Sequence, residues 1–230
     1  MIRIDVNQNS ATRERNKRMA ETLCYIMGAG DFTDSYLPPK GSFVIAADGG
    51  YQYLKDCGIE PDLVVGDFDS LGRVPVHPNV VQHPVMKDDP DMMLAVKMGL
   101  DRGCRMFVLN GSLGGRLDHS VANLQILSFL AEQGARGFLI GPKQNVAGLS
   151  NGSLNFHPNC TGILSVFSST ERSEGITLSG LQYCLHDATL TSSRPLGLSN
   201  EFIGESATVQ VKKGILFVFW SGGLHETIGL

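Results

Sequence analysis

Aspartates and glycines follow three short apolar runs of this chain. In an open parallel sheet, ligands bind outside the carboxyl ends of the strands, where glycines let the backbone approach and side chains converge. We therefore expect the aspartates that follow these runs to face one crevice. The three segments are Val44–Gly50, Leu63–Ser70 and Val108–His119.

Asp67 and Asp69 form the pair with the clearest chemistry. Alternate residues of an extended segment point to the same side, and two carboxylates placed there repel each other unless a cation or a proton lies between them. Magnesium prefers oxygen ligands and is commonly held by one or two carboxylates plus substrate phosphates. The alternative is an Asx-turn, in which Asp69 and Ser70 bond local backbone amides. The two further strand ends with glycine and aspartate favour the metal.

Lys87 and the acids that follow it, Asp88, Asp89 and Asp91, lie just before a predicted helix. One carboxylate could cap that helix, with Pro90 near its first position. Capping explains one aspartate and not three. We therefore expect at least one of these acids to bind a metal and Lys87 to bind a phosphate. The alternative is an exposed acidic helix start.

Gly114, Gly115 and Arg116 precede the clearest predicted helix of the chain. Glycines before a helix N-terminus form an anion site, to which Arg116 adds a bidentate donor. The Gly-Lys-Ser/Thr sequence of a P-loop is absent. An N-cap is the alternative role for Asp118. His119 stays outside the predicted catalytic set, because a lone histidine at a helix start is more often structural or solvated.

The elements that must position these residues alternate between short apolar runs and longer mixed segments, from about Leu23 to Ile140. This alternation is typical of strands and crossover helices in a parallel sheet, and it predicts a doubly wound half. The predicted strands are Leu23–Met27, Ser42–Ala46, Leu63–Val65, Val80–Gln82, Met106–Leu109 and Gly137–Ile140. The predicted helices are Gly50–Cys57, Asp91–Asp101 and Asp118–Gln133.

After about Asn145 the chain changes to short apolar or alternating runs, separated by Gly, Ser, Asn and Lys turns. Such spacing favours an antiparallel sandwich or barrel. We expect the boundary between the two halves within Gly141–Gly152, where Gly, Pro, Asn and Ser accumulate. The predicted strands are Gly162–Phe167, Gly175–Leu178, Ala188–Thr191, Ala207–Val211 and Ile215–Trp220.

Composition limits the classes of partner. The chain has 230 residues, 42% of them hydrophobic, and a formal net charge of −4, so we expect a globular core and no bulk attraction to nucleic acid or to a membrane surface. The basic cluster between Arg13 and Arg18 favours a solvated helix or arm over an RNA contact. Five scattered cysteines and the lack of a signal-like or spanning apolar run predict reduced thiols and a cytoplasmic location.

The ordered set of motifs closely resembles the thiamine pyrophosphokinase (thiamine diphosphokinase) family. Each motif is weak alone, and their order and spacing make the resemblance specific. The resemblance extends to the C-terminal half through Gly197–Phe202, which looks like the Ser-Asn motif that helps to hold thiamine. The matching motifs of the N-terminal half are Ala47–Gly50, Gly66–Ser70, Lys87 to Asp91 and Gly115 to Asn123.

This resemblance implies an α/β domain over residues 1–145 that binds ATP and Mg²⁺, followed by an antiparallel β-sandwich domain over residues 146–230. It also implies a homodimer whose active sites lie at the interface, with thiamine contacted by both subunits. The primary hydroxyl of thiamine would attack the β-phosphorus of ATP and release AMP. In such a transfer, catalysis is mostly positioning and charge neutralisation.

The resemblance also implies roles for individual residues. Magnesium would be served by Asp67, Asp69 and Asp91, with Asp48 in the same acidic cluster. The phosphates of ATP would be bound by Lys87 and Arg116, together with Gly114, Gly115 and Asn123.

For thiamine, Asp118 would face the aminopyrimidine or the hydroxyl, and Ser199 and Asn200 would complete the pocket. Tyr183 is the candidate, by rough alignment, for the aromatic ring against thiamine, although it could equally be a buried sandwich residue. The family's C-terminal tryptophan is not at the expected place, because Trp220 lies in an apolar run typical of core.

Two other functions fit the same residues. An Asp-rich, metal-dependent phosphohydrolase would release phosphate or AMP from a nucleotide without thiamine. A non-catalytic nucleotide or thiamine sensor would keep the pocket alone. The acidic set argues against the sensor, because a pure binder gains nothing from crowding so many carboxylates.

Overall fold

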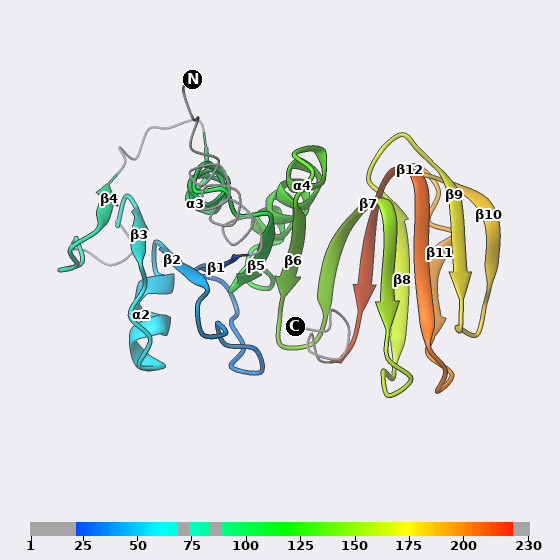
Figure 1. Ribbon diagram of the computed structural model, residues 1–230, viewed down its shortest axis with the longest axis horizontal. Helices are drawn as coiled ribbons and strands as arrows, with labels where there is room; N and C mark the ends of the chain where they lie inside the picture. The colour runs from blue at the N-terminus through cyan, green and yellow to red at the C-terminus, as the bar shows by residue number, and fades with distance from the viewer. Residues whose placement is uncertain (1–21, 69–73, 83–88, 223–230) are drawn as a thin grey trace, which may run out of the picture.

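The computed structural model describes residues 22–68, 74–82 and 89–222. Within these residues, an α/β half and an all-β half lie side by side along the longest axis of the molecule (Figure 1). No helix in these segments combines the length and apolar character needed to cross a membrane.

The α/β half is built on a parallel sheet in the order β4-β3-β2-β1-β5-β6. Its central strands are buried along their whole length, because their sequences are continuous apolar runs that face helices or core on both sides. The strands are β1 (Leu23–Met27), β2 (Phe43–Ala47), β3 (Leu63–Gly66), β4 (Val80–Gln82), β5 (Met106–Asn110) and β6 (Arg136–Ile140).

Within the described residues, three helices cover the two faces of this sheet. Along β1, Tyr25 belongs to one core cluster and Ile26 to the other, since alternate residues of a strand face opposite sides. Helix α2 (Gly50–Asp56) packs into the first cluster, and α3 (Asp91–Asp101) and α4 (Leu117–Glu132) pack into the second. The predicted doubly wound α/β half is therefore confirmed.

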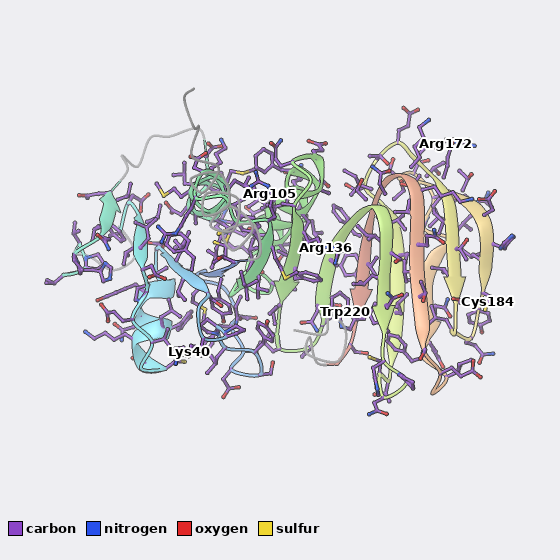
Figure 2. The ribbon with its side chains drawn as sticks, in the orientation of Figure 1. Lys40, Arg105, Arg136, Arg172, Cys184 and Trp220 are labelled. Carbon is purple, nitrogen blue, oxygen red and sulfur yellow. The ribbon has the colours of Figure 1, made fainter. Side chains whose placement is uncertain are left out.

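The all-β half is an antiparallel β-sandwich, as predicted. Its longest strand, β12, pairs with β9 through its first part and with β8 through its second part, with a register shift between Val211 and Ile215. A bulge of this kind bends a strand so that it can serve two sheets. Trp220 is buried in the core beside Phe156, as its apolar run predicted (Figure 2). The strands are β7 (Asn145–Phe156), β8 (Ile163–Ser168), β9 (Arg172–Ser179), β10 (Leu185–Thr191), β11 (Gly197–Glu201) and β12 (Ala207–Trp220).

Some predicted elements differ from those observed. The runs predicted as separate strands at 207–211 and 215–220 belong to the single strand β12, because the intervening Lys212-Lys213-Gly214 forms its bulge. Strands β7 and β11 were not predicted, since Gly, Ser and Asn interrupt their apolar residues. The sheet itself runs on across the predicted boundary, because β6 pairs antiparallel with β7. A division between residues 145 and 146 stays a prediction.

Candidate functional site

A cleft of about 540 Å³ opens where the carboxyl ends of β1, β2 and β5 meet the first turns of α3 and α4. This is the position at which open parallel sheets bind ligands. Of the predicted site residues, Asp48, Asp91 and Arg116 line the cleft, together with Gly114, Gly115 and Asn123.

One wall of the cleft is made by two loops that continue the pairing of β1 with β5 beyond the strands. Gly28 N donates to Asn110 O at 2.8 Å, and Gly30 N donates to Gly111 O at 2.8 Å. The approach is so close that a Cβ on Gly28 would lie 2.7 Å from Gly111 O. Only glycine allows backbones to meet at this distance, so the wall depends on these residues.

Asp48 and Asp67 end two neighbouring strands. The amide of Asp48 donates to Val65 O at 2.8 Å, and a Cβ on Gly66 would lie 3.1 Å from the Cα of Asp48. Asp48 and Phe68 both have left-handed backbones, with φ of 48° and 61°. That conformation costs non-glycine residues roughly 1–2 kcal/mol, and such strained residues cluster at functional sites. Asp67 itself is half-buried and is not among the residues that line the cleft.

Arg116 and Asp118 pair with each other at the start of α4. The guanidinium Nε donates to Asp118 Oδ1 at 3.1 Å, and Nη2 donates to Oδ2 at 2.6 Å. These hydrogen bonds and the opposite charge raise the pKa of Arg116 and lower the pKa of Asp118. The N-cap of α4 is Arg116, so the alternative role of Asp118 as the N-cap is wrong.

The turn before α4 is shaped by two glycines and one asparagine. Gly114 and Gly115 have left-handed backbones, with φ of +84° and +59°. The carboxylate of Asp31 lies against Gly114, where a Cβ would be 2.0 Å from Oδ2. Asn123 is buried on α4 and donates from Nδ2 to Ser112 O at 2.6 Å, which ties the loop after β5 to the helix.

The predicted thiamine residues of the β-sandwich lie together. The buried side chain of Asn200 accepts from Tyr183 N at 2.9 Å and donates to Tyr183 O at 2.7 Å. Ser199 precedes it with a left-handed φ of 59°, and its amide donates to Ser165 Oγ at 3.0 Å. The ring of Tyr183 is 65% exposed, so the alternative of a buried sandwich residue is wrong.

Within one chain, these residues are remote from the cleft, and none of them lines it. The path from β5 to β11 through β6, β7, β12 and β8 has five strand-to-strand steps, or roughly 24 Å at the usual strand spacing. Cys184, the neighbour of Tyr183, lies at the side of the sandwich away from the α/β half (Figure 2).

Two predicted site residues, Asp69 and Lys87, lie outside the described residues. Among the residues that are described, no group of three or more histidine, cysteine, aspartate or glutamate side chains is close enough to hold a metal ion. The assignment of a metal to Asp67, Asp69 and Asp91 therefore stays a prediction.

The segment Gly28–Asp31 also lines the cleft and was not predicted to do so. Its signal was present, because the apolar run Leu23–Met27 is followed by glycines and an aspartate in the same way as the other strands. His119, which was set aside, also lines the cleft, as does Ser112.

Comparison with known proteins finds two family models that match this chain. The model of the thiamin pyrophosphokinase catalytic domain matches residues 36–139, and the model of the thiamin pyrophosphokinase vitamin B1 binding domain matches residues 153–216. The first contains the strand ends of β2, β3 and β5, and the second contains Tyr183 and Asn200.

Individual proteins are similar over most of their length. The thiamine pyrophosphokinase of Bacillus subtilis (strain 168) is 28% identical over 184 residues, which are 77% of this chain and 86% of that protein. The crystal structure of thiamine pyrophosphokinase from Bacillus subtilis has a TM-score of 0.77 and 26% identity, covering 88% of this chain and 100% of that one.

Two further solved structures have the same fold. The structure of a thiamin pyrophosphokinase family protein from Enterococcus faecalis has a TM-score of 0.73 and 27% identity, covering 88% of this chain and 99% of that one. Thiamin pyrophosphokinase from Candida albicans, at 16% identity, has a TM-score of 0.70 over 89% of this chain and 90% of its own, a likeness that concerns the fold alone.

Proposed function

The chain belongs to the thiamin pyrophosphokinase family and is an ATP-dependent diphosphotransferase that makes thiamine diphosphate, and we propose that the reaction takes place at the cleft beside α4. The observation that carries this proposal is the meeting of Asp48, Asp91 and Arg116 around one cleft at the strand ends. Carboxylates and a guanidinium in one cleft suit a polyphosphate that arrives with a cation.

The polyphosphate binds at the turn before α4. The backbone of Gly114 and Gly115 carries no side chain to block an anion, and the N-terminus of a 16-residue helix favours negative charge. Arg116 supplies a forked donor that matches phosphate geometry, and Lys87 is assigned a second positive charge. Asn123 ties the loop after β5 to α4 through its hydrogen bond to Ser112 O.

Mg²⁺ would be held by Asp67, Asp69 and Asp91, with Asp48 assigned to the same acidic cluster. The donor set fits this ion, because all four side chains offer hard oxygen atoms, and Asp48 and Asp67 directly follow β2 and β3. Magnesium usually takes only one or two carboxylates and completes its octahedron with water and substrate phosphates, so a closed cage of protein ligands is not required. When bound, the ion neutralises charge on the transferred diphosphate.

Thiamine lies between two subunits. Asp118, paired with Arg116 in the first turn of α4, belongs to one subunit, and Tyr183, Ser199 and Asn200 belong to the β-sandwich of the other. Two observations support this arrangement: none of the sandwich residues lines the cleft of its own chain, and apolar side chains are exposed beside each set. Leu117, next to Asp118, is 79% exposed, and Leu198, next to Ser199, is 60% exposed. A homodimer interface buries such side chains.

Tyr183, Asp118 and Arg116 each have a role in the transfer. The ring of Tyr183 packs against the thiamine cation, since aromatic faces attract positive charge. Asp118 orients the thiamine hydroxyl, or accepts its proton, as the oxygen attacks the β-phosphorus of ATP. Arg116 stabilises the charge that develops on the transferred group, and AMP leaves.

The direct test incubates the full chain with Mg·ATP and thiamine and measures AMP and thiamine diphosphate by chromatography. The expected result is equal formation of both products, with no AMP when thiamine is omitted. AMP formation that ignores thiamine would establish the phosphohydrolase instead. Binding of either substrate with no AMP at all would establish the sensor. All five cysteines are free thiols, which agrees with the proposed cytoplasmic location.

A further inference from the structure

Asn110 is a buried polar residue to which neither the motifs nor the proposed reaction assigns a role. It ends β5 and is 0% exposed. Its amide uses its full hydrogen-bonding capacity of two donors and two acceptor sites. Nδ2 donates to Tyr25 Oη at 2.8 Å and to Thr33 O at 2.7 Å, and Oδ1 accepts from Gly111 N at 2.8 Å and from Thr33 N at 3.1 Å.

The partners determine the orientation of this amide. Oδ1 faces two backbone N–H groups, and Nδ2 faces a backbone carbonyl, so an exchange of the two atoms would leave three of these contacts unfavourable. The side chain therefore pairs with both the N–H and the C=O of Thr33, as a neighbouring strand would. This contact joins residues that are 77 positions apart in the chain.

The backbone of the same residue holds the other end of the loop. Asn110 O accepts from Gly28 N at 2.8 Å, so Asn110 anchors both the first and the last residue of the segment Gly28–Thr33. Between these two anchors, Gly28 to Asp31 line the cleft. Four of the six residues in the anchored segment therefore form a wall of the cleft.

We propose that Asn110 is a positioning residue that sets the affinity of the cleft for ATP by fixing both ends of the Gly28–Thr33 wall. It does not touch the ligand; it acts through the wall. The inference rests on the proposed function, in which this cleft binds ATP. Because the wall carries none of the groups assigned to the reaction itself, Asn110 affects binding of ATP more than the rate of transfer.

The test compares Asn110→Leu with the matched control Asn145→Leu in the full chain. Asn145 is also a buried asparagine at a strand end, but its Nδ2 donates to Gly222 O at 2.7 Å, and it is not among the residues that line the cleft. Both variants are expected to lower the melting temperature, because each removes buried hydrogen bonds. Only Asn110→Leu is expected to raise the KM for ATP.

The expected rise is about tenfold, which corresponds to 1.4 kcal/mol and to the net loss of one or two hydrogen bonds. The KM for thiamine should stay within about twofold, and kcat within about threefold, of the wild-type values. Calorimetric titration of the chain with Mg·ATP provides a second reading that needs no turnover. An unchanged KM and dissociation constant for ATP in Asn110→Leu would overturn the proposal.

A second variant covers the case in which Asn110→Leu fails to fold. Asn110→Asp keeps an acceptor for Thr33 N and Gly111 N. It replaces the Nδ2 donor with a carboxylate oxygen, which would repel Thr33 O. Protonation of this carboxyl at low pH restores the donor, so the KM for ATP relative to wild type should fall as the pH is lowered. A ratio that does not change with pH would contradict the proposal. Failure of the proposed function is distinguishable from failure of this proposal, because in that case the wild-type chain itself would make no thiamine-dependent AMP.

Discussion

Arg116 donates two hydrogen bonds to the carboxylate of Asp118, from Nε at 3.1 Å and from Nη2 at 2.6 Å. The two residues were assigned to different substrates, Arg116 to the phosphates of ATP and Asp118 to thiamine. A phosphate bound at Arg116 must therefore compete with Asp118 for the guanidinium, or share it. One ion pair therefore links the residue assigned to ATP with the residue assigned to thiamine.

The first prediction concerns the pKa of Asp118. Hydrogen bonds from Arg116 lower this pKa, so Arg116→Gln should raise it toward the ordinary range of an aspartate. Because the pKa is lowered by folding, any stability that the pair provides is present above the unfolded pKa and is lost as the pH falls through the folded one. Both side chains are exposed, so that stability is small. NMR titration of labelled aspartate carboxyls measures the pKa, and an unchanged value in Arg116→Gln would contradict the pairing.

The second prediction concerns the acid at the end of β3. Asp67→Asn should reduce turnover by at least about 100-fold, since even changes outside the ligand shell of a metal site cost 10–100-fold. Chelation of Mg²⁺ should abolish the activity of the wild-type chain, and added Mg²⁺ should restore it.

The control for this variant is Asp62→Asn. Asp62 lies at the opposite end of β3, and its Oδ2 accepts from Val44 N at 2.8 Å. That change should lower the melting temperature and leave the turnover of folded protein intact. If Asp67→Asn behaved like Asp62→Asn, the carboxylate of Asp67 would be structural.

The third prediction concerns Gly114 and Gly115 in the turn before α4. It separates the backbone strain of a side chain at positive φ from a steric clash with Asp31. Gly114→Ala and Gly115→Ala should each cost about 1 kcal/mol, because both positions have positive φ. Gly114→Ala should also raise the KM for ATP, since its Cβ would lie 2.0 Å from the carboxylate of Asp31, whereas Gly115 has no heavy atom within 4 Å of the added carbon. Kinetics and thermal unfolding of both variants measure the difference. Adding Asp31→Ala to Gly114→Ala should recover part of the affinity; no recovery would show that Asp31 is not the obstacle.

The fourth prediction tests whether each active site is shared by two subunits. Arg116→Gln removes the phosphate donor, and Asn200→Ala removes the side chain that holds the backbone of Tyr183. Each variant alone should be nearly inactive. A mixture refolded together should recover about one quarter of wild-type activity, because half of the dimers are mixed and each of these has one intact site. Mixing Arg116→Gln with Gly114→Ala provides the control, since both changes fall in the same half-site. If the mixture of Arg116→Gln and Asn200→Ala showed only the average activity of its two parent variants, the whole site would lie in one subunit.

Strand ends of the α/β half were predictable, because buried parallel strands are continuous apolar runs. A glycine directly after such a run marks the point at which the strand ends. Asp48 was found in this way, whereas Asp91 and Arg116 were found from the acids and the glycines that precede two predicted helices, and the structure brings all three to one cleft. Gly28–Asp31 has the same signal and was overlooked. By contrast, nothing in the sequence indicates that Asn110 pairs with Thr33, because a contact over 77 residues depends on the tertiary fold.

The β-sandwich was less predictable for a physical reason. Strand β7 contains Gly148, Ser150, Asn151 and Gly152, which have low strand propensity, yet β12 pairs with it along most of its length. Tertiary pairing overrides local preference in such a strand. The exposure of Tyr183 was also hidden, because a tyrosine between turns fits a core or a surface equally well.

Strand β6 is hydrogen-bonded to β5 on one side and to β7 on the other, so one backbone ladder crosses from the α/β half into the sandwich. A single core cluster also contains residues of both halves, from Tyr25 to Trp220. Neither half can swing against the other, or melt alone, without breaking this ladder and opening that core. On heating, the chain should therefore show one calorimetric peak whose van't Hoff and measured enthalpies agree.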